Sequence, residues 1–581
     1  MWHYGEKLTA LRGPITTTNA LADWEEKMKY RTPMTQLPTH EVTNQAAPLG
    51  DYNACDTDIP LREALQREAP SWVLGYAQEL GQATGSEFYR ELGFLANQHV
   101  PELKTFDRYG HRVDEVEFHP AYHDLMSMAI RHDIHSIAWK RPGEGGAVAH
   151  TAAMYLLTQP EQGVCCPITM THAVVPALRH QPELAAEWEP RILSSQYDPR
   201  CLPAGEKTGV TFGMAMTEKQ GGSDVRANTT RAVPLGKGGP GADYELVGHK
   251  WFCSAPMSDG FLTLAQTEAG LSCFLVPRWR PDGSRNPFFI QRLKDKLGNR
   301  SNASSEIEYN GTYAVMVGAE GRGVATIIEM VHQTRLDAAT APPGMMRHAL
   351  VQAVHHAKHR KAFGELLINQ PLMRNVLADL ALEVEAATAM VMRVARAFDE
   401  SHSDTQAQLF SRIATPVTKF WTNKRAPEFI YETMECLGGA GYVEESGMPR
   451  LYREAPLNSI WEGSGNVICL DILRAMQREP ETVSVFMGEL QGAAGGNVHL
   501  DRAIERLQTE LRDPSDVQLR ARRVASLMAL SLQASLLVRH APAAVADAFC
   551  ATRLGADAGD VYGTLPVGAD LALILERTGL V

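Results

Sequence analysis

The sequence predicts an α+β protein in which a helical domain is followed by a β domain and then by more helices. Three observations carry this prediction. Apolar residues recur every three or four positions up to about residue 200, they alternate with polar residues between 211 and 318, and helical spacing returns after Gly321. With 581 residues, the chain exceeds what one hydrophobic core usually supports. We therefore expect several domains.

The N-terminal part divides into an undetermined extension, residues 1–38, and a helical domain, residues 39–210. The extension lacks the apolar segment and small-residue cleavage site of a signal peptide, and Met34 is an alternative start, so residues 1–33 stay open. Beyond it, LREALQREAPSWVLGYAQELGQ and AYHDLMSMAIRHDIHSIAW have helical spacing. We expect this first domain to be entirely helical.

The β domain is predicted for residues 211–318, starting at TFGMAMTEK. The segments DYELVGHKWFCSA and SSEIEYNGTYAVMVG alternate between apolar and polar residues, and turn-forming Gly, Pro, Asn and Asp separate them. Several strands of this kind predict a barrel or a sandwich.

Residues 319–480 are predicted to form a helical bundle, and residues 481–581 a further helical domain. In the bundle, one apolar stripe follows three and four spacing from Leu372 to Phe398. The segment REPETVSVFMGELQGAAGGN, near 480–500, has no clean period and is expected to be a linker. The apolar run VASLMALSLQASLLV is interrupted by polar residues and too short to span a bilayer, which predicts a buried helix and no membrane segment.

Composition and missing motifs exclude several classes of function. A net charge of -12 argues against nonspecific nucleic-acid binding by the protein as a whole. The nine cysteines contain no CxxC pair, so we expect reduced thiols in a cytoplasmic protein and neither a zinc site nor a disulfide framework. No GxGxxG, P-loop, HExxH or GxSxG motif is present, and no metal site is predicted.

The first positive signal is GMAMTEKQGGSDV, residues 213–225, at the junction of the helical and β domains. Its backbone amides, hydroxyls and glycines would suit a planar ring with several acceptor atoms and a diphosphate. A purely structural turn explains the local pattern equally well. The segment alone does not decide between the two.

The order of the segments resembles the acyl-CoA dehydrogenase flavoprotein family. TEKQGGSD is similar to the family's TEPxAGSD signature, and five further segments match the family in the same order: GHKWFCSAP, KDKLGNRSNASSEIEY, HRKAFGELLINQPLM, ECLGGAGY and SIWEGSGNVICLDILR. The resemblance implies an acyl-CoA dehydrogenase-like fold: an N-terminal helical domain, a middle β-barrel or sandwich domain and a C-terminal four-helix bundle. Here an extra helical C-terminal domain follows.

The same resemblance implies a site for FAD. The residues that would surround the flavin and its diphosphate within one chain are Met214, Met216, Thr217, Gly222, Ser223, Trp251, Cys253, Ser254, Trp461, Gly463, Ser464 and Asn466. Those that would reach the cofactor of a neighbouring subunit are Arg360, Phe363, Gln370, Glu435, Gly438 and Gly439. A shared site requires at least a dimer, and the family is usually tetrameric. For each of these residues, packing or a surface contact is the alternative role.

Glu462 in NSIWEGSGN is the candidate catalytic base. Removing hydrogens from Cα and Cβ of an acyl thioester requires a base for the α-proton, and a carboxylate desolvated beside Trp461 would have a pKa closer to neutrality. One family branch carries its base at the position of Thr334, which cannot serve as a base, so Glu462 remains. A structural acid is the alternative interpretation.

Two departures from the family concern the substrate. Trp461 replaces the usual tyrosine and should crowd the acyl side, which makes long acyl chains less favourable. Arg335 matches a family contact to CoA, but His332 replaces the acid that usually accompanies it. Acyl-CoA recognition is therefore less well supported than flavin binding.

The long C-terminal extension, together with RLYRE and NSIWEGSGN, resembles the alkylation-response (AidB) branch of the family. That branch implies binding of FAD and double-stranded DNA, protection against DNA alkylation and weak isovaleryl-CoA dehydrogenase activity. Arg520, Arg522 and Arg523 are candidate DNA contacts, although interleaved acids make a solvated helix face the simpler interpretation. The alternatives are a dedicated short-chain or branched-chain acyl-CoA dehydrogenase without a DNA role, and an acyl-CoA oxidase.

Overall fold

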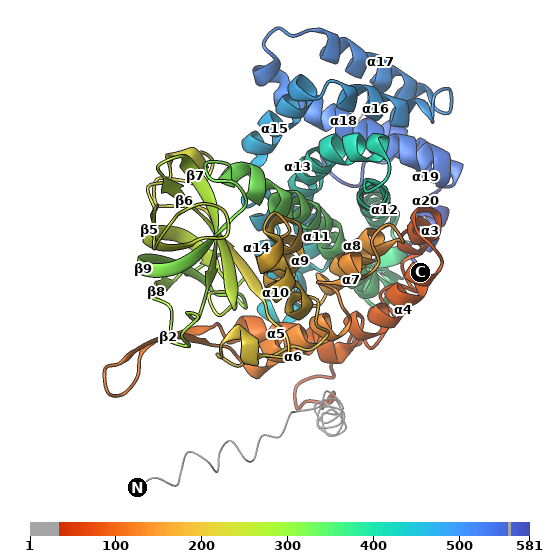
Figure 1. Cartoon of the computed structure of the whole chain (residues 1–581). Helices are drawn as coiled ribbons and strands as arrows, with labels where there is room; N and C mark the ends of the chain where they lie inside the picture. Colours follow the sequence, from red (N-terminus) through yellow and green to blue (C-terminus); the bar gives the residue numbers. More distant parts are fainter. Residues whose placement is uncertain (1–33, 556–558) are drawn as a thin grey trace.

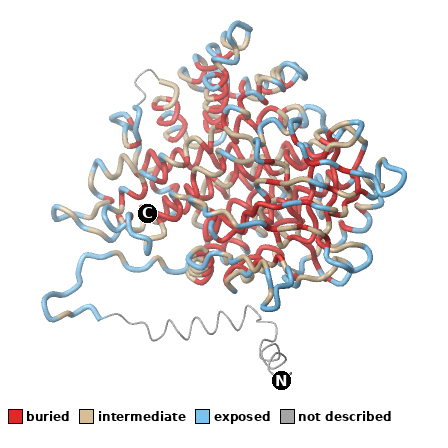
Figure 2. The backbone as a smooth tube through the Cα atoms, turned by 90° about the vertical axis from the view of Figure 1, so that its left-hand side faces the viewer, coloured by how far each residue is buried: buried red, intermediate tan, exposed pale blue. Residues whose placement is uncertain are grey.

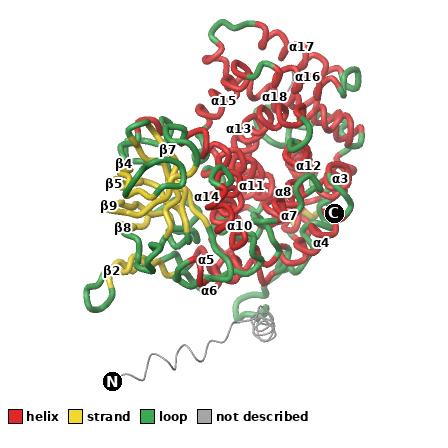
Figure 3. The backbone as a smooth tube through the Cα atoms, in the orientation of Figure 1, coloured by secondary structure: helices red, strands yellow, loops and turns green. Residues whose placement is uncertain are grey.

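The computed structural model describes residues 34–555 and 559–581. Figure 1 shows the β domain beside a large body of helices, with the C-terminal helices over one end of the central bundle. Figure 3 separates the same parts by secondary structure, with strands on one side and helices on the other. The predicted succession of helical, β, helical and helical parts is confirmed.

The N-terminal domain contains eight helices in the described part of the chain. They are α3 (Ile59–Glu68), α4 (Trp72–Thr84), α5 (Glu87–Gln98), α6 (Pro120–Arg131), α7 (Ile137–Lys140), α8 (Gly146–Leu157), α9 (Cys165–Leu178) and α10 (Pro182–Ile192). The prediction of an entirely helical domain was wrong at one place. An antiparallel hairpin of β1 (Glu102–Phe106) and β2 (Arg112–Glu117) projects between α5 and α6. Each strand is so short that its alternation is easily missed among helices.

The β domain is a closed barrel with two added strands. Its strands are β3 (Phe212–Ala215), β4 (Arg231–Pro234), β5 (Asp243–Ser254), β6 (Gly260–Thr267), β7 (Gly270–Pro277), β8 (Phe288–Leu293) and β9 (Ser304–Val317). The order β6-β4-β5-β9-β7 closes because β7 pairs with β6, while β3 pairs with β6 and β8 with β9. Of the predicted barrel and sandwich, the structure shows the barrel.

Three long helices and two shorter ones form the bundle in the described part of the chain. They are α11 (Gly323–His359), α12 (Pro371–Glu400), α13 (Thr405–Cys436), α14 (Met448–Glu454) and α15 (Gly465–Arg478), and the short strands β10 (Lys361–Ala362) and β11 (Glu365–Leu366) join α11 to α12. The predicted apolar stripe lies on α12 and is buried from Leu380 to Phe398, whereas Leu372 at its start is 83% exposed.

Three apolar cores hold these parts together, and Figure 2 shows the buried backbone running through the centre of the molecule. One core joins the N-terminal helices, the bundle and the C-terminal helices. A second lies where α9 and α10 meet the strands β3, β6 and β7 and the start of α11. The third fills the barrel. The second core is the junction at which the predicted cofactor segments meet.

The C-terminal domain comprises α16 (Glu481–Gln491), α17 (Val498–Arg512), α18 (Val517–His540), α19 (Ala543–Arg553) and α20 (Leu571–Glu576). The predicted linker near 480–500 was wrong, because α16 occupies half of it and buries Phe486 and Leu490. The predicted buried helix is confirmed as α18. It is long and apolar enough to cross a membrane, but 72% of its most apolar window is buried inside the protein.

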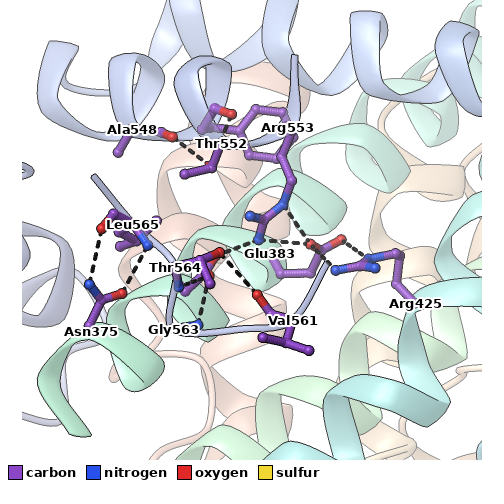
Figure 4. A network of polar contacts seen from close by, with 12 residues as sticks. Asn375, Glu383, Arg425, Ala548, Thr552, Arg553, Val561, Gly563, Thr564 and Leu565 are labelled. Atoms are coloured by element: carbon purple, nitrogen blue, oxygen red, sulfur yellow. Dashed lines mark hydrogen bonds and ion pairs between the residues drawn. The ribbon is translucent and has the colours of Figure 1, made fainter. Parts of the chain in front are cut away.

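A buried polar network attaches this domain to the bundle. Glu383 on α12 accepts hydrogen bonds from Arg425 on α13 and from Arg553 on α19, and the side chain of Asn375 exchanges hydrogen bonds with the backbone of Leu565 (Figure 4). Burial alone would raise the pKa of Glu383, but the two guanidinium groups lower it below its usual value. The extra domain is therefore joined to the bundle by polar contacts as well as by the shared core.

Candidate functional site

The loop that carries Glu462 has an unusual backbone. It follows a short 3₁₀ turn (Leu457–Ser459) and leads into α15. Glu462 has a φ of 56° and Gly463 a φ of 98°, so two successive residues are in the left-handed region. That conformation costs a residue with a Cβ of order 1 kcal/mol, and strained backbone of this kind is typical of functional sites. The sequence did not predict this conformation of Glu462, because glutamate rarely adopts a left-handed backbone.

The Glu462 carboxylate is partly buried and has one close partner. The Thr334 hydroxyl on α11 donates a hydrogen bond to its Oε2 at 2.5 Å. Burial raises the pKa of Glu462 above its usual value, while the Thr334 hydrogen bond and the charges of Lys419 and Arg335 oppose the rise. The net raised pKa matches what the sequence predicts for a base.

Two cationic side chains hold the carbonyl groups around Glu462. The Lys419 ammonium on α13 is buried and donates to the carbonyl oxygens of Asn458, Trp461 and Gly463, each at 2.9 Å. Arg335 donates from Nε to the Glu462 carbonyl at 3.2 Å. Three successive carbonyls, from Trp461 to Gly463, thus face cations. Lys419 was not predicted from the sequence, where its only signal is a lysine between Thr418 and Phe420 in TPVTKFW.

Arg335 is oriented inward by an acid that the sequence analysis did not identify. Its NH1 donates to Asp471 on α15 at 2.8 Å, and its side chain is only 12% exposed. Asp471 also accepts from Arg412 on α13. His332 stacks on Phe398 instead, and burial, followed by the charges of Arg412 and Arg335, lowers its pKa to about 3. The missing acid beside Arg335 is therefore supplied from α15, and Arg335 supports the loop.

The segment after β3 presents free hydrogen-bond donors. Trp251 on β5 donates its backbone N–H to the Thr217 carbonyl at 2.7 Å, which fixes the two segments together. A Cβ at Gly222 would lie 2.3 Å from the Thr217 hydroxyl oxygen, so glycine is required for this approach. Within the described residues, the Thr217 hydroxyl and the amides of Gly222 and Ser223 have no hydrogen-bond partner. Such a cradle of donors suits phosphate oxygens and ring acceptor atoms.

A buried ion pair stabilises the turn that carries these donors. Glu218 accepts from the Lys250 ammonium at 2.9 Å and from the amides of Thr229 and Thr230, and neither charged side chain is exposed. Burial would raise the pKa of Glu218, but Lys250 and these hydrogen bonds hold it well below its usual value. In the sequence, Glu218 is one residue of the TEKQGGSD signature, whereas in the structure it anchors the turn.

Strand β5 supports the site through a β-bulge between Lys250 and Cys253. The bulge turns the Trp251 ring toward Lys294, whose ammonium lies 3.5 Å from the ring centroid. Cys253 does not fit its predicted role. Its side chain is fully buried in the core of the barrel, because the bulge changes the alternation of the strand, and it cannot cover a ring outside. Ser254 remains partly exposed.

Met214, Met216 and Trp461 pack against the same apolar core. All three are partly buried and pack against the core that contains Met170 and Ala173 of α9. The Trp461 indole donates to the Asn458 side chain at 2.6 Å, which fixes its orientation. The structure thus brings the predicted ring-lining residues and the base loop to the same junction.

The start of α15 lies beside two cations. A Cβ at Gly465 would be 3.1 Å from Lys424 Cε and 3.5 Å from Arg522 NH2, and Arg522 also donates to the Asn466 side chain at 2.9 Å. Ser464 precedes the helix and provides no side-chain cap. Cations at the positive end of a helix are unfavourable unless an anion lies near them. This arrangement favours a negatively charged ligand.

The residues predicted to serve a neighbouring subunit form a second set at the surface of the chain. Phe363 is fully exposed at the tip of the β10–β11 hairpin and has a φ of 53°. Glu435, Gly438 and Gly439 are exposed around the end of α13. Arg360 and Gln370 are partly exposed and use one hydrogen bond each, to the backbone carbonyls of Asn44 and Ala362.

The three arginines predicted to contact DNA differ from one another. Arg520 donates to carbonyls of Glu510, Asp513 and Ser515 and so closes the end of α17. Arg522 holds Asn466. Arg522 and Arg523 are both exposed, and Arg523, at 59%, pairs with Glu510.

A basic hollow lies next to Arg523. It has a volume of about 330 Å³, and Arg502, Arg506, Arg523 and Arg553 line it with no carboxylate among the lining residues. Arg502 and Arg506 are exposed, and no ion pair engages them in the described part of the chain. In the sequence, both arginines lie among acidic residues in DRAIERLQTE, so their position alone did not indicate a basic surface.

Comparison with known proteins shows which protein families the three main parts of the chain match. Residues 44–199 match the family described as the adaptive response protein AidB N-terminal domain. Residues 213–312 match the acyl-CoA dehydrogenase middle domain, and residues 321–477 match the acyl-CoA dehydrogenase C-terminal domain.

Individual proteins agree with these matches. The chain is 45% identical to the putative acyl-CoA dehydrogenase AidB of Escherichia coli, over 93% of this chain and 98% of that protein. It is 31% identical to acyl-CoA dehydrogenase family member 11 of Caenorhabditis elegans, over 83% of each. The crystal structure of C. elegans ACDH-11 in complex with C11-CoA superposes with a TM-score of 0.79 and 28% identity, over 90% of this chain and 93% of that one.

Proposed function

The chain belongs to the acyl-CoA dehydrogenase family, in the branch with an AidB N-terminal domain, and from this premise we propose that it is an FAD-dependent dehydrogenase of a short or branched acyl-CoA. One observation carries the proposal. Glu462, with its raised pKa, lies on a strained loop next to Trp461, which packs against the same apolar core as Met214 and Met216.

The residues present fit a flavin dinucleotide. The unpartnered donors of Thr217, Gly222 and Ser223 suit ring acceptors and a diphosphate. Lys424 on α13 and Arg522 on α18 lie beside the start of α15 and would offset further negative charge of the cofactor. FAD, when bound, supplies the hydride acceptor that the thioester chemistry requires.

The other half of the chemistry belongs to the chain itself. The Glu462 carboxylate removes the α-proton of the thioester, and its raised pKa brings it closer to the range in which a base works at neutral pH. The Glu462 N–H has no partner within the described residues and can donate to the thioester carbonyl as negative charge develops there. Trp461, fixed by Asn458, limits the space for the acyl chain, so we propose a short substrate.

We propose that the functional unit is a homo-oligomer, a tetramer in accordance with the family. The fully exposed Phe363 and the neighbouring surface set would then meet the cofactor of another subunit. A fully exposed phenylalanine with a left-handed backbone is an unfavourable surface feature in an isolated chain.

The test is Glu462→Gln, measured with isovaleryl-CoA and an artificial electron acceptor. We expect kcat to fall at least about a thousandfold, since the amide cannot take the proton, while the flavin absorbance of the purified protein stays unchanged. Glu445→Gln, in an exposed turn, is the control. Wild-type turnover in Glu462→Gln would refute the assignment of the base.

A second function, binding of duplex DNA, is favoured by the basic hollow. Arg502, Arg506 and Arg523 line the hollow, whereas Arg520 and Arg522 do not and donate hydrogen bonds elsewhere in the chain, so we propose that the first three make the phosphate contacts. In line with the branch, such binding would serve protection against alkylation damage. This function is compatible with weak or residual dehydrogenase activity.

Salt-dependent retardation of a duplex tests the DNA proposal. Replacing Arg502, Arg506 and Arg523 by alanine should lower the slope of log K against log salt by about three, since each phosphate contact contributes about 0.9. The matched control replaces the exposed Arg108, Arg231 and Lys237. Equal slopes for the two triple variants, or no binding by wild type at low salt, would exclude this face.

A further inference from the structure

We propose that Lys419 is a positioning residue of the site, which sets the direction of the Glu462 N–H and holds the base on its loop. The inference rests on the proposed function for its chemistry, but its geometry is independent of that function. The Lys419 ammonium lies under the loop, and each of its three protons has one carbonyl acceptor, on Asn458, Trp461 and Gly463 at 2.9 Å.

The direction follows from the planarity of the peptide group. In a trans peptide, the carbonyl of one residue and the N–H of the next point in opposite directions. Lys419 binds the Trp461 carbonyl, so the Glu462 N–H points away from α13. Lys419 and Arg335 together fix the planes of three successive peptides by the same rule, from Trp461 to Ser464. Contacts on the opposite side of the loop thus orient the Glu462 N–H, which would donate to the thioester.

The same contacts stabilise the left-handed backbone of Glu462. A lysine with three acceptors at good distance can offset a local strain of order 1 kcal/mol. No neutral side chain offers three donors from one atom, and an uncharged lysine amine has only two. The arrangement therefore requires an ammonium, and loss of its proton must release one of the three carbonyls.

The surroundings of Lys419 include charges of both signs. Glu462 faces it from the loop, Arg335 from α11, and Lys424 lies one and a half turns further along α13. Burial lowers the pKa of Lys419 most, the charge of Glu462 raises it, and the charges of Arg335 and Lys424 lower it, so that the net pKa is about 7. As the pH rises through about 7, Lys419 loses its proton, and we expect the loop of residues 458–465 to become less ordered.

Amide hydrogen exchange of the FAD-loaded wild-type protein tests the loop directly. After correction for intrinsic rates, protection of residues 458–465 should fall at least about tenfold between pH 6.5 and 8.5. Lys419→Arg keeps a charged donor, and its protection should not change with pH. Thr422→Val, which removes a buried hydrogen bond of the same helix to α11, is the control and should behave as wild type. Constant protection in wild type would overturn the proposal.

Kinetics separate positioning from general stability. In Lys419→Met we expect kcat with isovaleryl-CoA to fall about a hundredfold, as for loss of one oxyanion donor, with less than a threefold change in KM. Equal losses in Lys419→Met and Thr422→Val would overturn the positioning role. If Lys419→Met does not fold, the wild-type pH dependence and Lys419→Arg still decide. If wild type has no turnover, the proposed function fails, while hydrogen exchange still tests the geometry.

Discussion

Thr334 and Glu462 come from α11 and from the loop before α15, and a hydrogen bond of 2.5 Å joins them. The hydroxyl stabilises the ionised carboxylate and so opposes the rise in pKa that burial causes. A base acts when it is ionised, so activity should increase with pH through the pKa of Glu462. The hydrogen bond thus extends the active range toward acid.

Thr334→Val removes this hydrogen bond while keeping the shape of the side chain. The pKa of Glu462 should rise further, and the acid limb of the kcat profile should move to higher pH. At a fixed pH on that limb we expect turnover to be about tenfold slower, the value for one hydrogen bond to a charged group. Thr340→Val, on the same helix and away from Glu462, is the control. An unmoved acid limb would contradict the role of Thr334.

At the residue scale, the sequence predicted some site members and missed others for a physical reason. Glu462, Thr217 and Gly222 lie in continuous signatures, so their neighbours along the chain identify them. Lys419 and Asp471 act on groups that only the fold brings near. Cys253 failed because a bulge reversed the side of the strand on which it lies. No local pattern indicates a bulge.

At the scale of elements, α15 and α18 meet at the hydrogen bond between Arg522 and Asn466. This contact connects the C-terminal domain to the first turn after the base loop. Arg522→Ala should loosen that turn and, on the proposed function, weaken flavin retention about fivefold, the equivalent of about 1 kcal/mol for one hydrogen bond. The rate of flavin release during dialysis measures this retention, and Arg512→Ala on α17 is the control. Unchanged retention would show that α15 holds its place without α18.

Element prediction succeeded where patterns are long. The apolar stripe of α12 and the apolar run of α18 extend over many turns, and both were identified. The hairpin of β1 and β2 was missed because its strands are short, and α16 was missed because glycines and charged residues surround its eleven residues. Short elements gain their stability from tertiary packing, which the local sequence does not display.

At the scale of the molecule, the Glu383 network joins two domains through a buried carboxylate with guanidinium groups on both sides. The folded pKa of Glu383 lies below its ordinary value of 4.5. Its contribution to stability is therefore complete above the pKa of the unfolded chain and is lost as pH falls through the folded pKa.

Glu383→Gln should lower the free energy of unfolding by about 3 kcal/mol at pH 7, because it leaves buried guanidinium charge uncompensated. The difference from wild type should shrink below pH 4. Glu400→Gln, in the exposed pair with Arg396 on the same helix, should change it by less than about 0.5 kcal/mol. Denaturant unfolding with limited proteolysis of residues 481–581 measures both. Equal effects of the two substitutions would show that the network does not hold the domain.

The order of domains was predictable from the sequence because each has its own periodicity over a hundred residues or so. The packing of the last domain was not, because the contacts that fix it, such as Arg553 with Asp379 and Arg577 with Glu385, join residues far apart in the chain. The charges in the sequence do not predict which arginine pairs with which acidic residue.

Arg522 and Arg523 are neighbours on α18, and each lies at a different one of the two proposed ligand sites. Arg522 reaches the loop region of the proposed flavin site, whereas Arg523 lines the basic hollow. On the two proposed functions, a displacement of this turn by an anion bound in the hollow would also move the contact with Asn466. Thermodynamic linkage would then make the effect reciprocal: the factor by which DNA changed the affinity for flavin would equal the factor by which flavin changed the affinity for DNA. The redox cofactor would act in this way as an effector of nucleic-acid affinity.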